Sequence, residues 1–169
     1  MRSAFAEAFR ILKPNRYMSV VFGNSSGQIW SLVQRAMRDA GFKAAPAHVA
    51  ILDKGQRSVK GLNSGSESVV TVDLILTVQK PAKTENAADA QELRNGDTQR
   101  LITEAVTELS GDDRTPSHVY ARILRKAIQR HYTLDQLHLS DVLLALRNAG
   151  YVTNHKTGLL APTNSKAVA

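Results

Sequence analysis

The stretch FRILKPNRYMSVVF, residues 9–22, combines the end of an amphipathic helix, a Lys-Pro turn and an apolar strand. Pro14 and Asn15 end the helix, because proline cannot continue one and asparagine favours turns. Residues 17–22 are apolar almost throughout, which is typical of a strand that is buried on both faces. A helix that leads into a buried strand so early in a chain predicts further strands for it to pack against.

The segment after this strand predicts a helix. Ser25 or Ser26 can cap it, apolar residues repeat at three- and four-residue spacing, and Gly41 ends it. The next predicted strand is 48–52. Because a helix connects the two strands, we expect them to run parallel with a right-handed crossover.

A third strand is predicted at 68–80, where SVVTVDLILTVQK is rich in β-branched residues. The loop before it, DKGQRSVKGLNSGSE, is too polar and too rich in glycine and serine for a crossover helix. A direct return favours an antiparallel strand. We therefore expect an α/β fold built as strand, helix, strand and antiparallel strand.

The second half predicts a different organisation. Residues 82–97 mix alanine with charges and are interpreted as a linker that can be partly helical. Three helix patterns follow, the second with a Thr cap and Pro116 at its first turn, and the third with a Ser cap. Residues 151–162 predict a hairpin. The expected division is an α/β part at 1–81, the linker, and a small helical, winged-helix-like domain at 98–169.

Composition limits the classes of function. The chain of 169 residues has no cysteine, which excludes disulfides and cysteine zinc sites and fits a cytoplasmic protein. No apolar run is long enough to span a bilayer, so we expect no membrane partner. The net charge is +7. Residues 1–81 hold eleven basic and five acidic residues, whereas 82–169 hold eleven and ten. A polyanionic partner would therefore meet mainly the first half.

Four segments carry a resemblance to a known family: EAFRILKPNRYMSVVFGNSSGQIW, DAGF at 39–42, LDKGQRSVK at 52–60 and DLILTVQKP at 73–81. In this order they resemble the C-terminal part of class I S-adenosylmethionine-dependent methyltransferases, most closely the site-specific, adenine-type amino-methylating DNA methyltransferases. The resemblance covers about the first half of the chain. It implies the last third of a Rossmann-like sheet, whose final strand inserts antiparallel between its two predecessors.

Two motifs that the resembled family uses for catalysis are absent from this sequence. Family members hold the cofactor on a Gly-rich turn after a strand and the target amino group on a Pro-Pro-Tyr/Phe motif. The five prolines here are never adjacent, and no G-x-G turn follows a strand. We expect no catalytic residue and no cofactor bound by this chain alone, with S-adenosylmethionine bound only if another half completes the fold. Asn15 and Val59 stand where the family usually has Gly and Phe.

Two predicted nucleic-acid sites lie in the first half. Asn24 and Ser25 follow the end of a strand, where open α/β sheets place ligands, although a helix cap explains them as well. The loop after the second strand is rich in groups that bind phosphates or base edges, and a solvated surface loop is the alternative. Its candidate residues are Lys54, Gln56, Arg57, Ser58 and Lys60.

A third site is predicted on the middle helix of the second half, where Arg122, Arg125 and Lys126 recur at helical spacing with Arg130. They could follow a phosphate backbone. The alternative is a charged face that nearby acidic residues neutralise. The acidic residues are Glu104, Glu108, Asp112 and Asp113. The histidines have no metal-ligand spacing, so we expect no metal, and Trp30 and Tyr120 are expected in the core.

The function we expect is that of a truncated or split DNA methyltransferase-like protein, which contributes DNA recognition or assembly. One alternative is a non-enzymatic nucleic-acid-binding or regulatory winged-helix protein, and another is an interaction protein that recruits a partner through its tail. If the family's preceding strand is absent, strand 17–22 has an open apolar edge. We therefore expect a homodimer or a complex with a catalytic partner chain.

Overall fold

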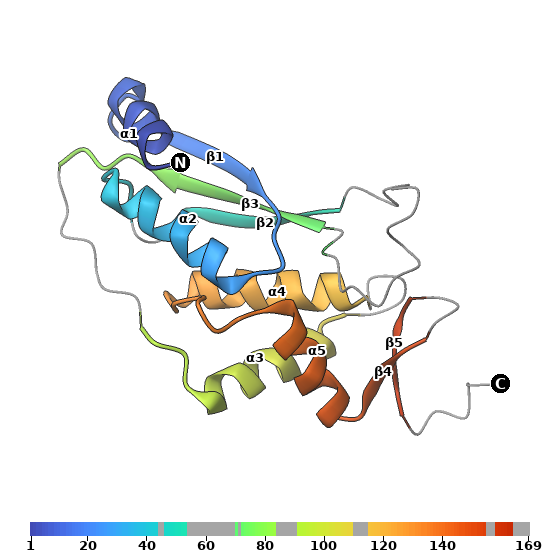
Figure 1. Cartoon of the computed structure of the whole chain (residues 1–169). Helices are drawn as coiled ribbons and strands as arrows, with labels where there is room; N and C mark the ends of the chain where they lie inside the picture. The colour runs from blue at the N-terminus through green and yellow to red at the C-terminus, as the bar shows by residue number, and fades with distance from the viewer. Residues whose placement is uncertain are drawn as a thin grey trace.

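The computed structural model describes residues 1–43, 46–53, 70, 72–83, 91–109, 115–154 and 158–163. These residues form a mixed α/β fold with two small antiparallel sheets. Figure 1 shows the larger sheet as one layer, with α2 and α4 along it and α3, α5 and the hairpin farther away. Among the described helices, none combines the length and apolarity that crossing a bilayer requires.

The larger sheet consists of β1 (Tyr17–Phe22), β2 (His48–Asp53) and β3 (Val72–Gln79). Its order is β1-β3-β2, and β3 runs antiparallel to both neighbours, so β1 and β2 run in the same direction. The predicted strand directions are therefore confirmed. The third strand is shorter than predicted.

The helices of the first half are α1 (Arg2–Ile11) and α2 (Gly27–Asp39), which pack against each other. Asn15, in the turn after α1, has a φ of 61°. This left-handed conformation suits asparagine and glycine better than other residues. Lys80 fixes the same turn, because its Nζ donates to the Phe9 carbonyl at 2.6 Å and lies 4.4 Å from the Phe9 ring centroid.

One face of the larger sheet is buried. The alternate residues of β3 from Val72 to Val78 are almost fully buried, and Phe22 of β1 meets Trp30 of α2 edge to face with ring centroids 5.0 Å apart. The helices α2 and α4 pack on this face. Trp30 and Tyr120 are 1% and 0% exposed, so the prediction that they belong to the core is confirmed.

The other face of the sheet corrects the prediction that 17–22 is buried on both sides. Tyr17 and Val21 are 55% and 53% exposed, and Ser19 is exposed as well. Alternate side chains of a strand point to opposite faces, and the described helices cover only one of them. The open face carries polar cross-strand pairs: Ser19 Oγ lies 2.9 Å from Thr77 Oγ1, and Gln79 Nε2 donates to the Tyr17 hydroxyl at 3.2 Å.

The second half contains α3 (Asn95–Thr107), α4 (Pro116–Gln129), α5 (Leu139–Asn148) and a hairpin of β4 (Tyr151–Thr153) and β5 (Leu160–Pro162). The three predicted helices and the hairpin are confirmed as elements. The Thr115 side chain caps α4 as predicted, by accepting from the His118 amide at 3.2 Å. The cap of α5 was predicted wrongly, because His138 is the N-cap residue and Ser140 lies inside the helix.

The two halves share one hydrophobic core, since α4 packs against β2 and β3. The closest approach is at Gly27, the first residue of α2. A Cβ added there would lie 2.0 Å from the Leu134 carbonyl oxygen and 2.7 Å from that of Leu137. The end of the expected linker is also held, because Gln91 exchanges backbone hydrogen bonds with His131 and Thr133, both at 2.8 Å.

Gly27→Ala is expected to destabilise the protein by about 3 kcal/mol, because its methyl group collides with backbone that cannot rotate away. Gly96→Ala, also in the first turn of a helix, has nothing within 4 Å of the new Cβ and should be neutral or stabilising by up to about 1 kcal/mol. Urea denaturation measures both. Equal stability of the two variants would contradict the close packing of α2 on residues 134–137.

Candidate nucleic-acid interface

Asn24 lies between β1 and α2, and both its side chain and its backbone hold that connection. Its Oδ1 accepts from the Ser26 amide at 2.8 Å, and its carbonyl accepts from Trp30 Nε1 at 2.9 Å. Ser26 occupies the N-cap position without a side-chain hydrogen bond to the helix. The Asn24 carboxamide thus supports the start of α2, which is the structural alternative weighed for this residue.

The backbone of Ser25 joins the sheet to the helical region. Its carbonyl accepts from the Leu139 amide at 3.0 Å and from the Tyr120 hydroxyl at 3.2 Å. The same hydroxyl lies 2.8 Å from the Leu137 carbonyl. Burial raises the pKa of Tyr120, and the charge of Asp141 raises it further. Tyr120 therefore remains a neutral donor to both carbonyls.

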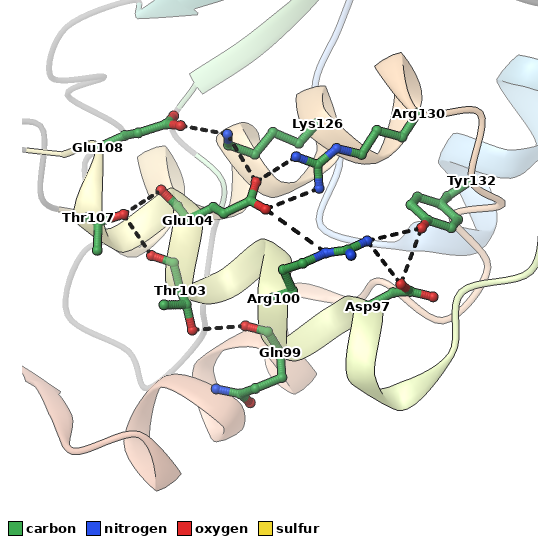
Figure 2. A network of polar contacts seen from close by, with 10 residues as sticks. All are labelled: Asp97, Gln99, Arg100, Thr103, Glu104, Thr107, Glu108, Lys126, Arg130 and Tyr132. Carbon is green, nitrogen blue, oxygen red and sulfur yellow. Dashed lines mark hydrogen bonds and ion pairs between the residues drawn. The ribbon is translucent and has the colours of Figure 1, made fainter.

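The basic residues of α4 meet the acidic residues of α3 in a network of ion pairs (Figure 2). Lys126 Nζ lies 2.6 Å from Glu108 and 3.3 Å from Glu104. Arg130 lies 2.7 Å from Glu104, and Arg122 lies 3.6 Å from Glu108. The structure therefore brings two predicted nucleic-acid residues, Arg122 and Lys126, into contact with carboxylates, as the alternative of a neutralised face requires.

Glu104 is the carboxylate that several of these cations share. The hydrogen bond from Arg130 lowers the pKa of Glu104, and Lys126 lowers it further. The pKa of Arg130 is raised mainly by the same hydrogen bond. Arg100 and Asp97 extend the network along α3, since their side chains are 3.1 Å apart. The network holds α3 to α4 in addition to the apolar contacts between them.

Arg125 takes no part in the ion pairs of this network. It has no ion pair or hydrogen bond with any residue that the structure describes. With Arg122 it lines a hollow of about 400 Å³ between β2 and α4. The other residues of that lining are His48, Val49, Ala50, Ile51, Asp53 and His118.

Two residues that line this hollow, His118 and Asp53, contact each other. His118 Nε2 lies 3.2 Å from Asp53 Oδ2, and His118 Nδ1 lies 2.7 Å from Thr115 Oγ1. Asp53 directly precedes the predicted basic loop in the sequence. The contact thus places Asp53, the residue before that loop, beside the first turn of α4.

The loop candidates themselves lie outside the described residues: Lys54, Gln56, Arg57, Ser58 and Lys60. The sequence reasoning missed the contact between His118 and Asp53 and the hollow beside β2. Their only sequence signal is a histidine three residues after a Thr cap, and nothing pairs it with an aspartate 65 positions earlier. Among the described residues, no group of three or more His, Asp or Glu side chains could hold a metal ion.

Neither the family models, the curated proteins nor the solved structures compared with this chain gave a match.

Tyr120→Phe is expected to destabilise the protein by about 1–2 kcal/mol, because the buried Leu137 carbonyl loses the donor that lies 2.8 Å away. Tyr17→Phe removes the same hydroxyl from an exposed position and should cost less than about 0.5 kcal/mol. Chemical denaturation at pH 7 measures both. A Tyr120→Phe protein as stable as Tyr17→Phe would contradict the role of this hydroxyl in joining the two halves.

Glu104→Gln is expected to lose stability relative to the natural chain at pH 7 but not at low pH. The pKa of Glu104 is lowered from 4.5 in the folded protein, so its stabilisation is present above pH 4.5 and is lost as the pH falls through the folded value. Unfolding midpoints between pH 7 and pH 3 measure this difference. Arg130→Gln should also remove most of the stabilisation that Glu104 gives at pH 7. If the losses of stability in the two single variants add up in the double variant, the ion pair between Glu104 and Arg130 is contradicted.

Proposed function

We propose that β1, β2 and β3 form the C-terminal sheet of a class I S-adenosylmethionine-dependent DNA methyltransferase-like protein. The second half of the chain forms a winged-helix-like region joined to this sheet. In this proposal they contribute DNA recognition or assembly and do not transfer methyl groups alone. The observation that carries it is the order β1-β3-β2, with β3 antiparallel between two strands of the same direction. The family that the sequence resembles closes its sheet in this way.

The free edge of β1 supports the part of the proposal that concerns assembly. Among the described strands β1 pairs only with β3, and its segment Tyr17–Phe22 has neither lysine nor proline to block pairing. The exposed Tyr17 and Val21 continue this apolar edge onto the open face of the sheet. A second copy or a chain that supplies the cofactor half would cover both surfaces.

The DNA part of the proposal rests on the basic loop and on Arg125. Asp53, the residue before the loop in the sequence, contacts His118 of α4, and Arg125 of the same helix has no partner among the described residues. Lys126 is a weaker candidate, because Glu104 and Glu108 both contact it, and Arg122 has one longer contact, to Glu108 at 3.6 Å. The predicted contacts are to phosphates, which give affinity without sequence specificity.

A second candidate is a non-enzymatic nucleic-acid-binding or regulatory protein of the winged-helix type. It is favoured by three helices followed by an antiparallel hairpin. It differs from the first candidate in requiring no cofactor half. The two candidates therefore separate when the free edge of β1 is tested for a partner.

Titration calorimetry of the purified chain with S-adenosylmethionine is expected to show no saturable heat. The physical reason is that the sequence contains neither the Gly-rich cofactor turn nor the Pro-Pro motif. Sedimentation of the same sample should give a dimer, or a monomer that becomes a complex when the cofactor half is added. Micromolar cofactor binding by the chain alone would overturn the statement that it cannot act without a second half.

Replacing Lys54, Arg57 and Lys60 with alanine is expected to weaken binding to duplex DNA and to reduce the slope of log K against log salt by up to about 2.7. The matched control replaces Lys13, Arg16 and Arg35, which are exposed basic residues elsewhere in the first half. It removes the same charge. Fluorescence anisotropy from 50 to 200 mM salt measures both, and equal losses would show only a diffuse charge effect and contradict a site at the loop.

A further inference from the structure

The hollow beside β2, called here the β2–α4 groove, runs along the backbone edge of the strand. His48, Val49, Ala50 and Ile51 all line it. Successive side chains point to opposite faces of a sheet, so a hollow lined by four successive residues follows the edge and not one face. Among the described strands β2 pairs only with β3, so no described strand pairs with the N–H and C=O groups of its other edge.

The opposite wall of the groove is one face of α4. His118, Arg122 and Arg125 are spaced by four and three residues, which places them on one side of a helix. The separation of seven residues from His118 to Arg125 corresponds to about 10.5 Å along the helix axis. This equals about three residues of an extended strand, so the helix lines the groove over the length of a short extended segment.

Two of the residue types that commonly block strand addition are absent from β2 itself. His48–Asp53 contains no lysine and no proline, the residues that natural edge strands use to block pairing. The groove walls can therefore satisfy the backbone of an added strand on one side and its side chains on the other. A DNA backbone offers acceptors only and would leave the outward C=O groups of β2 without donors.

The charge of the α4 wall indicates which side chains fit. Arg125 has no ion pair or hydrogen bond within the described part of the chain. Arg122 reaches Glu108 only through Nη1, at 3.6 Å, and its buried Nε has no partner there. The carboxylate in the groove, that of Asp53, already contacts His118 at 3.2 Å. Guanidinium groups with donors to spare are complementary to carboxylates.

We propose that the β2–α4 groove binds an extended acidic peptide segment of a partner protein by strand addition. The backbone of the segment pairs with the free edge of β2, and acidic side chains at every second position reach Arg122 and Arg125. This inference goes beyond the proposed function, because it involves the other edge of the sheet. It assigns Arg125 to the peptide, which leaves the basic loop as the DNA contact in either candidate function.

The probe is the labelled pentapeptide Glu-Val-Glu-Val-Glu, followed by fluorescence anisotropy with the full chain. We expect saturable binding with a dissociation constant of about 100 μM, and a loss of at least about tenfold for Arg125→Glu. Arg125→Glu should keep the natural melting temperature, because the residue has no partner among the described ones. The matched control, Arg147→Glu on the exposed face of α5, should bind the peptide as the natural chain does.

Backbone methylation of the peptide distinguishes strand addition from charge attraction. Methyl groups on one alternate set of amides should abolish binding, and those on the other set should be tolerated, because only one set faces β2. The proposal is overturned if both methylated peptides bind alike, if Arg125→Glu has no effect, or if binding does not saturate by about 1 mM. It is also overturned if duplex DNA binds at Arg125 while the peptide does not, which would make the groove a phosphate site.

Discussion

The carbonyl oxygen of Ser25 and the missing side chain of Gly27 together fix how the helical region sits on the sheet. The carbonyl receives donors from Tyr120 and Leu139, and the glycine lets residues 134–137 approach to a distance that any Cβ would prevent. Leu134 adds a third bond by donating its amide to Ser31 Oγ at 3.1 Å. Because these contacts lie at the start of α2, they hold α4 against the buried face of the sheet.

This placement divides the positive charge of α4 between two environments. The side that meets α3 pairs with carboxylates, so its charge serves mainly to hold two helices together. The side that meets β2 carries Arg125, which has no such pairing among the described residues. A basic helix on its own therefore says little about nucleic acid, since adjacent positions of one helix differ in whether a carboxylate already neutralises them.

Most local features could be predicted from the sequence, because they depend on neighbours along the chain. The turn at Pro14 and Asn15, the Thr115 cap, the end of α2 at Gly41 and the antiparallel direction of β3 all follow from such local chemistry. The exposure of Tyr17 and Val21 could not be predicted in this way, because an apolar strand looks the same whether one face or two are covered. The prediction of the α5 cap was wrong because histidine, the residue at the N-cap, gives no capping signal, whereas Ser140 does.

The candidate sites were harder to predict for the same reason. The pattern of Arg122 and Lys126 left open whether they face carboxylates or solvent, and only their position against Glu104 and Glu108 settles which. The β2–α4 groove brings together two segments separated by more than sixty residues, so no local spacing reveals it. The candidate residues in the basic loop keep the status of a prediction.

The position of β3 between β1 and β2 has a consequence for how the chain reaches this fold. Ribosomes make the two outer strands first, and neither has a neighbour among the described strands until Val72–Gln79 has emerged. Pairs such as Tyr17 with Gln79 close loops of about sixty residues, a separation that slows folding. During synthesis β1 and β2 thus wait without a partner among the described strands, and the arrival of β3 gives both of them their backbone hydrogen bonds.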